Sequence, residues 1–134
     1  MTKTGGCLCG AVRYEVSGDP AMQLVCHCSH CQKQAGSAFS TIAGVPERAM
    51  TVTLGAPVTF IDHGESGQPV ERQFCGTCGS PLFSKVMAAP GMVFIKTGTL
   101  DDSSWFKPSA HIWTKSKQSW VDLGDVPAFK TNPG

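Results

Sequence analysis

Short alternations of apolar and polar residues predict a mostly β chain. Val12, Tyr14 and Val16 alternate with Arg13 and Glu15, which puts the apolar side chains on one face of a half-buried strand. Similar short runs predict further strands at 22–25, 38–43, 50–54, 58–61, 70–74, 82–86, 92–96, 111–113 and 120–122. Because long helical periodicity is absent, the sequence predicts several small sheets.

The polar segment 29–34 is predicted to form a helical turn or two, with Ser29 as its cap. Loops are expected at 63–69 and 98–108, and the tail after Pro127 is expected to be loosely held. A length of 134 residues with 41% apolar content predicts a single domain, 1–134, that can bury a core.

The charge balance excludes some classes of partner. Eleven Lys and Arg against ten Asp and Glu leave a net charge of +1, which argues against a nucleic-acid binder and against a polybasic membrane surface. No apolar signal-peptide region follows Met1, and no run approaches the roughly 18 apolar residues of a membrane span. The sequence therefore predicts a cytoplasmic protein.

The seven cysteines carry the strongest chemical signal. An odd number excludes complete internal disulfide pairing, and clustered cysteines in a reducing compartment are typical of metal-binding or catalytic sites. All seven fall into three tight groups, at 7–9, 26–31 and 75–78.

The first and last groups together predict a closed metal site. Cys75 and Cys78 flank a glycine-containing turn and supply two ligands, whereas a structural zinc needs four. Cys7 and Cys9 lie between glycines and are the natural second pair. We therefore expect a structural zinc on these four cysteines.

The middle group, Cys26, Cys28 and Cys31, then has three thiolates and a vacant fourth position, the pattern of a catalytic zinc. Zn²⁺ with three thiolates has a charge of 2 − 3 = −1, so the site favours a soft substrate thiol, which zinc keeps deprotonated as the nucleophile. Two readings compete with this one: a second structural zinc closed by His27 or His30, and free redox cysteines. Iron–sulfur ligation is a further alternative, although the spacing matches neither standard ferredoxin run.

Three motifs in order carry a resemblance to a known family: Gly6-Cys7-Leu8-Cys9-Gly10, Cys26-His27-Cys28-Ser29-His30-Cys31 and Phe74-Cys75-Gly76-Thr77-Cys78-Gly79-Ser80. Over about 5–129 the sequence resembles the glutathione-dependent formaldehyde-activating enzyme family, also called S-(hydroxymethyl)glutathione synthase-like proteins. The resemblance implies a β-tent (Mss-four-like) fold of small coiled β-sheets with two zinc sites per chain, and the same division of the cysteines into structural and catalytic ligands.

The reaction implied by the resemblance joins a small thiol, glutathione or an analogue, to formaldehyde or another small aldehyde, and it is classed as a carbon–sulfur lyase activity. A non-enzymatic β-tent zinc-binding interaction or chaperone module is the alternative, because fold similarity alone does not fix activity. An open second metal site favours the enzyme, and two closed sites favour the module.

Sequence alone does not rank the side chains that would meet the substrate. The candidates for a glutathione carboxylate are Arg13, Lys33, Arg72, Lys85 and Lys96. The candidates for proton transfer are His27, His30 and His111.

Overall fold

The computed structural model describes residues 2–133 and confirms a mostly β chain. The strands are β1 (Thr2–Gly6), β2 (Arg13–Ser17), β3 (Met22–Cys26), β4 (Ser40–Pro46), β5 (Met50–Leu54), β6 (Val58–Asp62), β7 (Val70–Phe74), β8 (Pro81–Val86), β9 (Met92–Lys96) and β10 (Ala110–Ile112). Helix α1 (Ser29–Ala35) and short 3₁₀ turns at Glu47–Ala49, Thr97–Thr99 and Thr114–Ser116 complete the elements. Within residues 2–133, no helix has the length and apolar character needed to cross a membrane.

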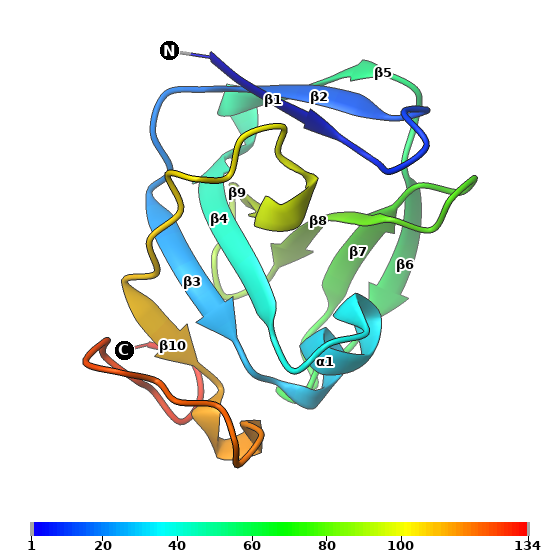
Figure 1. Cartoon of the computed structure of the whole chain (residues 1–134). Helices are drawn as coiled ribbons and strands as arrows, with labels where there is room; N and C mark the ends of the chain where they lie inside the picture. The colour runs from blue at the N-terminus through cyan, green and yellow to red at the C-terminus, as the bar shows by residue number, and fades with distance from the viewer. Residues whose placement is uncertain (1, 134) are drawn as a thin grey trace.

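The strands form two sheets. A three-stranded antiparallel sheet has the order β1-β2-β5, and a seven-stranded sheet has the order β10-β3-β4-β9-β8-β7-β6. Only β10 runs parallel to its neighbour, β3, among the strands of the described chain. Figure 1 shows the small sheet at one end of the molecule and α1 at the other, with the large sheet between them.

One face of the large sheet packs against the small sheet to form the main core. Tyr14 of β2 is only 1% exposed, and its ring meets Phe83 of β8 edge-on with 4.9 Å between ring centroids. Val45 and Ile95 from β4 and β9 join this cluster. Strand alternation therefore sends these side chains to one side and their neighbours along each strand to the other.

The opposite face of the large sheet carries a second apolar cluster and several buried polar groups. Leu24, Ile42 and Phe94 pack there with Ile112 of β10. Pairing of β3 with β4, and of β4 with β9, aligns Leu24 with Ile42 and Ile42 with Lys96. This face is therefore a surface on which Cys26, at the end of β3, lies among both apolar and charged neighbours.

Strand β1 was missed because Thr2–Gly6 has no apolar alternation; it pairs along its whole length with β2. The prediction of a strand at 120–122 was wrong: Trp120 is 73% exposed, and Lys117 Nζ donates to the carbonyl of Val121 within an irregular turn.

The expectation of a loosely held tail was also wrong. The amide of His111 donates to the carbonyl of Pro127, and the amide of Phe129 donates to the carbonyl of His111, each over 2.8 Å. These backbone bonds hold the tail beside β10, as Figure 1 shows near the C-terminus.

Candidate metal centres

Four cysteine sulfurs converge where the small sheet meets the turn between β7 and β8. The sulfurs of Cys7, Cys9, Cys75 and Cys78 all lie within 4.8 Å of one another. Cys9 Sγ lies 3.6 Å from Cys7 Sγ and 3.8 Å from Cys75 Sγ. A tetrahedral ion with sulfur ligands at ~2.3 Å has ligand–ligand edges of about 3.8 Å, so this donor set fits a structural zinc.

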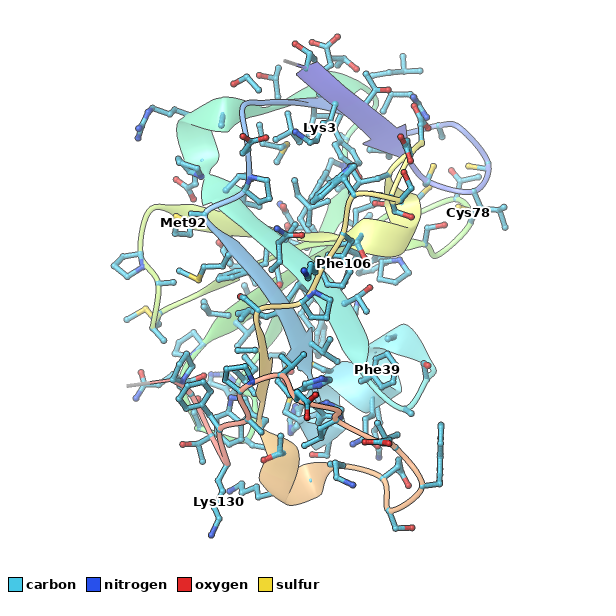
Figure 2. All side chains as sticks on the ribbon, turned by 60° about the vertical axis from the view of Figure 1, so that its left-hand side comes forward. Lys3, Phe39, Cys78, Met92, Phe106 and Lys130 are labelled. Atoms are coloured by element: carbon cyan, nitrogen blue, oxygen red, sulfur yellow. The ribbon has the colours of Figure 1, made fainter. Side chains whose placement is uncertain are left out.

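Backbone amides fix the four-cysteine cluster in place. The amide of Val12 donates to Cys7 Sγ over 3.2 Å, and the amide of Thr77 donates to Cys75 Sγ over 3.4 Å. Gly79 has φ of 81°, a left-handed conformation that lets the chain turn back into β8. Cys78 is labelled in Figure 2 at this turn, on the side of the molecule where β1 ends.

Ser80 ties the two halves of the four-cysteine cluster together. Its hydroxyl accepts a hydrogen bond from the amide of Leu8 over 3.0 Å and lies 3.2 Å from Cys78 Sγ. Hydrogen bonds from the side chain and backbone of Ser80 lower the pKa of the Cys78 thiol to about 5, which favours the thiolate that a metal requires.

The second cluster lies at the junction of β3 and α1. The sulfurs of Cys26, Cys28 and Cys31 lie within 4.8 Å of one another. Cys28, and not the predicted Ser29, caps the helix: its sulfur accepts a hydrogen bond from the amide of Cys31 over 3.2 Å. The amide of Ser29 donates instead to Glu65 Oε2 over 2.6 Å. The first turn of α1 thus positions two of the three sulfurs, those of Cys28 and Cys31.

Neither neighbouring histidine joins the three-cysteine cluster. Within residues 2–133, the grouping of possible ligand atoms contains only its three sulfurs. The buried ring of His27 turns away and bonds through Nε2 to His111 Nδ1 over 2.8 Å. His30 Nδ1 lies 2.9 Å from Asp62 Oδ1. The geometry therefore offers three thiol ligands, the donor set of an open rather than a closed site.

Two buried cations flank the three-cysteine cluster. Arg72 of β7 is 5% exposed, and its Nη1 lies 3.9 Å from Cys31 Sγ. Lys96 of β9 is 6% exposed. The pKa of the Cys31 thiol is lowered chiefly by hydrogen bonds from the two other cysteines of the cluster, and the charges of Lys96 and Arg72 act in the same direction.

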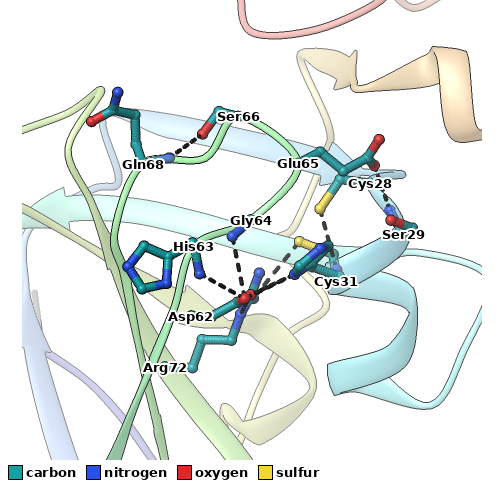
Figure 3. A network of polar contacts seen from close by, with 11 residues as sticks. Cys28, Ser29, Cys31, Asp62, His63, Gly64, Glu65, Ser66, Gln68 and Arg72 are labelled. Atoms are coloured by element: carbon teal, nitrogen blue, oxygen red, sulfur yellow. Dashed lines mark hydrogen bonds and ion pairs between the residues drawn. The ribbon is translucent and has the colours of Figure 1, made fainter.

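A carboxylate network supports Arg72 and His30. Figure 3 shows Asp62 at its centre, where it accepts hydrogen bonds from Arg72 Nε over 2.8 Å and from the amides of His63 and Gly64. Burial alone would raise the pKa of Asp62, but its hydrogen bonds with Arg72, His30 and the amide of Gly64 outweigh this effect and hold the pKa well below its usual range. Asp62 is thus a fixed anion that positions Arg72.

A surface cavity of about 450 Å³ lies between α1 and the strands β6 and β7. Its lining includes His30, Lys33 and Gln34 from the helix, Phe60 from β6, and Arg72. The Gln34 Oε1 atom is buried and has no hydrogen-bond partner within residues 2–133. Arg72 both lines the cavity and contacts Cys31, so its side chain links the cavity to the three-cysteine cluster.

The structure ranks the cations that the sequence left unranked. Arg13 pairs with Asp101, and Lys85 pairs with Glu47 over 3.2 Å, both away from the three-cysteine cluster. Lys33, Arg72 and Lys96 are the ones near it.

Sequence reasoning missed two acidic residues of the site, Asp62 and Glu65. His30 and Asp62 are 32 positions apart in the sequence, and their contact depends on sheet pairing that no local motif indicates. Asp62 directly follows the strand predicted at 58–61, and that was the one available signal.

Comparison with known proteins gives a consistent result. The sequence profile of the family described as "Glutathione-dependent formaldehyde-activating enzyme" matches residues 2–116. A protein of Halomonas elongata, provisionally named as such an enzyme, is 32% identical over 92% of this chain and 82% of its own length. Proteins of Fusarium vanettenii and Penicillium rubens with the same provisional name are 28% and 31% identical over 76% of this chain. The chain covers only 56% and 55% of those two fungal proteins.

A solved structure supports the fold. The crystal structure of a Rhodobacter sphaeroides protein, a structural genomics target, superposes with a TM-score of 0.60 and 21% sequence identity. The similarity covers 93% of this chain and 98% of that one, so the same arrangement of strands extends over almost the whole molecule.

Proposed function

Because the chain belongs to the glutathione-dependent formaldehyde-activating enzyme family, we propose that it catalyses the reversible addition of a small thiol to formaldehyde or another small aldehyde. Glutathione or an analogue is the proposed thiol. The observation that carries this proposal is the cluster of Cys26, Cys28 and Cys31, which holds three sulfurs and no fourth protein ligand within residues 2–133.

The proposed cofactors are two zinc ions per chain. Cys7, Cys9, Cys75 and Cys78 would hold a structural ion, and the three-cysteine cluster would hold the catalytic one. A zinc ion at the open site would keep the substrate thiol deprotonated near neutral pH. Free cysteines of this kind fit a reducing compartment, and we propose the cytoplasm as the setting.

The cavity beside α1 is proposed to hold the body of the thiol substrate. Its volume of about 450 Å³ falls within the ~300–1,000 Å³ of small-molecule sites. Asp62 already pairs with Arg72 and His30, so its negative charge does not offset that of Lys33. The positive charge of Lys33 is therefore free to bind a carboxylate of the substrate. The side-chain amide of Gln34 also lines the cavity and can form a hydrogen bond with a polar group of a peptide-like thiol.

The reaction itself is a simple addition. A lone pair of the thiolate sulfur forms the new carbon–sulfur bond, the carbonyl π pair moves onto oxygen, and that oxygen takes a proton from water. The reverse direction breaks the carbon–sulfur bond, which makes the activity that of a carbon–sulfur lyase. The contribution of the chain is to orient the thiol between the cavity and the cluster.

Exchange spectroscopy tests the proposal. Carbon-13 formaldehyde and glutathione form S-hydroxymethylglutathione without a catalyst, and NMR line shapes give the exchange rate. We expect the zinc-loaded protein to accelerate the exchange and a Cys28→Ser, Cys31→Ser double variant to leave the uncatalysed rate. A folded, zinc-loaded protein that gives no acceleration would refute the enzyme and favour the binding module.

A further inference from the structure

Lys96 is a buried cation whose side-chain hydrogen bond goes to a neutral residue. Its side chain extends along the face of the large sheet that carries Cys26, and its ammonium donates to Ser40 Oγ over 2.7 Å. Sheet register explains the direction: Ile42 lies opposite Lys96, and Ser40, two residues earlier on the same face, lies opposite Cys26. The ammonium therefore ends beside the strand position that carries the first sulfur of the cluster.

The charge of Lys96 has no carboxylate to balance it. Asp62 forms its ion pair with Arg72, and Glu65 accepts hydrogen bonds from the amide of Ser29 and the hydroxyl of Ser116. Within residues 2–133, no carboxylate lies within ion-pair distance of Lys96. A buried, uncompensated ammonium is strongly unfavourable, so the fold tolerates it only where another anion is present.

The sheet register brings the cysteine cluster to Lys96, because Ser40, which accepts the hydrogen bond of the ammonium, lies opposite Cys26. Burial lowers the pKa of Lys96, and the thiolate of Cys31 opposes this effect most among the neighbouring charges, followed by Cys26 and Cys28. The ammonium has three N–H donors and gives one to Ser40, which leaves two for a further acceptor at the site.

We propose that Lys96 makes the three-cysteine site specific for an anionic fourth ligand, the thiolate of the substrate, in preference to water. The inference rests on the function proposed above. A divalent ion with three thiolates has a charge of −1, which Lys96 brings to zero; a fourth thiolate then gives −1, whereas without Lys96 it would give −2. Lys96 is thus a specificity-determining residue, because it offsets the charge that the substrate sulfur brings.

Cobalt(II) in place of zinc gives a readout independent of turnover, since a fourth sulfur ligand changes the visible absorption of the ion. The cobalt-loaded protein is titrated with glutathione and, separately, with 2-mercaptoethanol, which has no carboxylate. We expect Lys96→Met to weaken both thiols about tenfold or more, the loss typical of one charge-assisted hydrogen bond. Lys96→Arg, which keeps the charge, should restore most of the affinity.

Two control variants separate charge from structure. Lys85→Met removes a half-exposed lysine that pairs with Glu47 on the surface, and it should change neither titration. Ser40→Ala removes the neutral partner but not the charge, so it should retain thiol affinity within about threefold of the unchanged protein. Cobalt spectra recorded before thiol is added show whether each variant still holds the ion.

Several results would overturn the inference. Equal affinities for Lys96→Met and the unchanged protein would remove any role for the charge, and a loss confined to glutathione would make Lys96 a carboxylate anchor instead. A loss in Ser40→Ala as large as in Lys96→Met would reduce Lys96 to a structural support. Failure of the unchanged protein to bind either thiol would refute the proposed function itself, which separates the two failures.

Discussion

The two cysteine clusters should differ in what they contribute to stability, and paired double variants measure the difference. Cys75→Ser with Cys78→Ser removes half of the four-cysteine cluster. Cys28→Ser with Cys31→Ser removes most of the three-cysteine cluster. The two doubles are matched because each replaces one buried and one less buried cysteine.

The expected magnitudes follow from the chain segment that each cluster closes. The four-cysteine cluster joins Cys9 to Cys75, which are 66 positions apart. A cross-link across that many residues restricts the unfolded chain by about 4 kcal/mol in the loop-entropy relation, whereas the segment from Cys26 to Cys31 gives only about 2 kcal/mol. Folded domains are stable by roughly 5–15 kcal/mol in total, so the first loss is a large share.

Urea unfolding of the zinc-loaded proteins, followed by tryptophan fluorescence, is the assay. With a slope of about 2 kcal/mol per M, the midpoint should fall by about 2 M for the 75/78 double and by about 1 M for the 28/31 double. Excess chelator takes the ion from both clusters, so it should lower the midpoint of the unchanged protein by about 3 M, the sum of the two losses. Equal losses in the two doubles would refute the assignment of one cluster to structure and the other to catalysis.

Three further predictions concern the residues around the clusters. Asp62→Asn leaves Arg72 buried without its anion and should lower the free energy of unfolding in urea by about 3 kcal/mol. Because folding lowers the pKa of Asp62, its contribution to stability is full above the unfolded pKa of about 4 and is lost as the pH falls below that value. The stabilities of the variant and the unchanged protein should therefore converge in acid. Tyr14→Phe removes the 2.7 Å hydrogen bond to Thr99 Oγ1 and should cost about 1 kcal/mol, whereas an unchanged stability would show that this hydrogen bond makes no net contribution. Lys85→Met breaks only a half-exposed ion pair and should shift stability by less than about 1 kcal/mol; a larger loss would contradict its assignment to the surface.

Local patterns were sufficient for most strands of this fold. The alternation around Tyr14 predicted β2, and its inward-facing residues are those that pack on the large sheet. The sequence did not predict β1, because Thr2, Lys3 and Thr4 show no apolar alternation. This strand forms through its pairing with β2. Pairing partners are a property of the whole fold, and a single segment does not encode them.

The sequence also separated the cysteines into the two groups whose sulfurs converge in space. It could not show how the charged groups around them are arranged. A lysine in a sequence is most often exposed, so the burial of Lys96 had no local signal. The link between Arg72 and Cys31 likewise depends on a strand 41 positions away.

A crystal structure of the zinc-loaded protein soaked with glutathione tests the central claim most directly. We predict zinc at both clusters, four cysteine sulfurs around one ion, and the sulfur of glutathione beside Cys26, Cys28 and Cys31 at the other. A protein side chain such as His30 in that fourth position, or glutathione bound away from the cluster, would contradict the account.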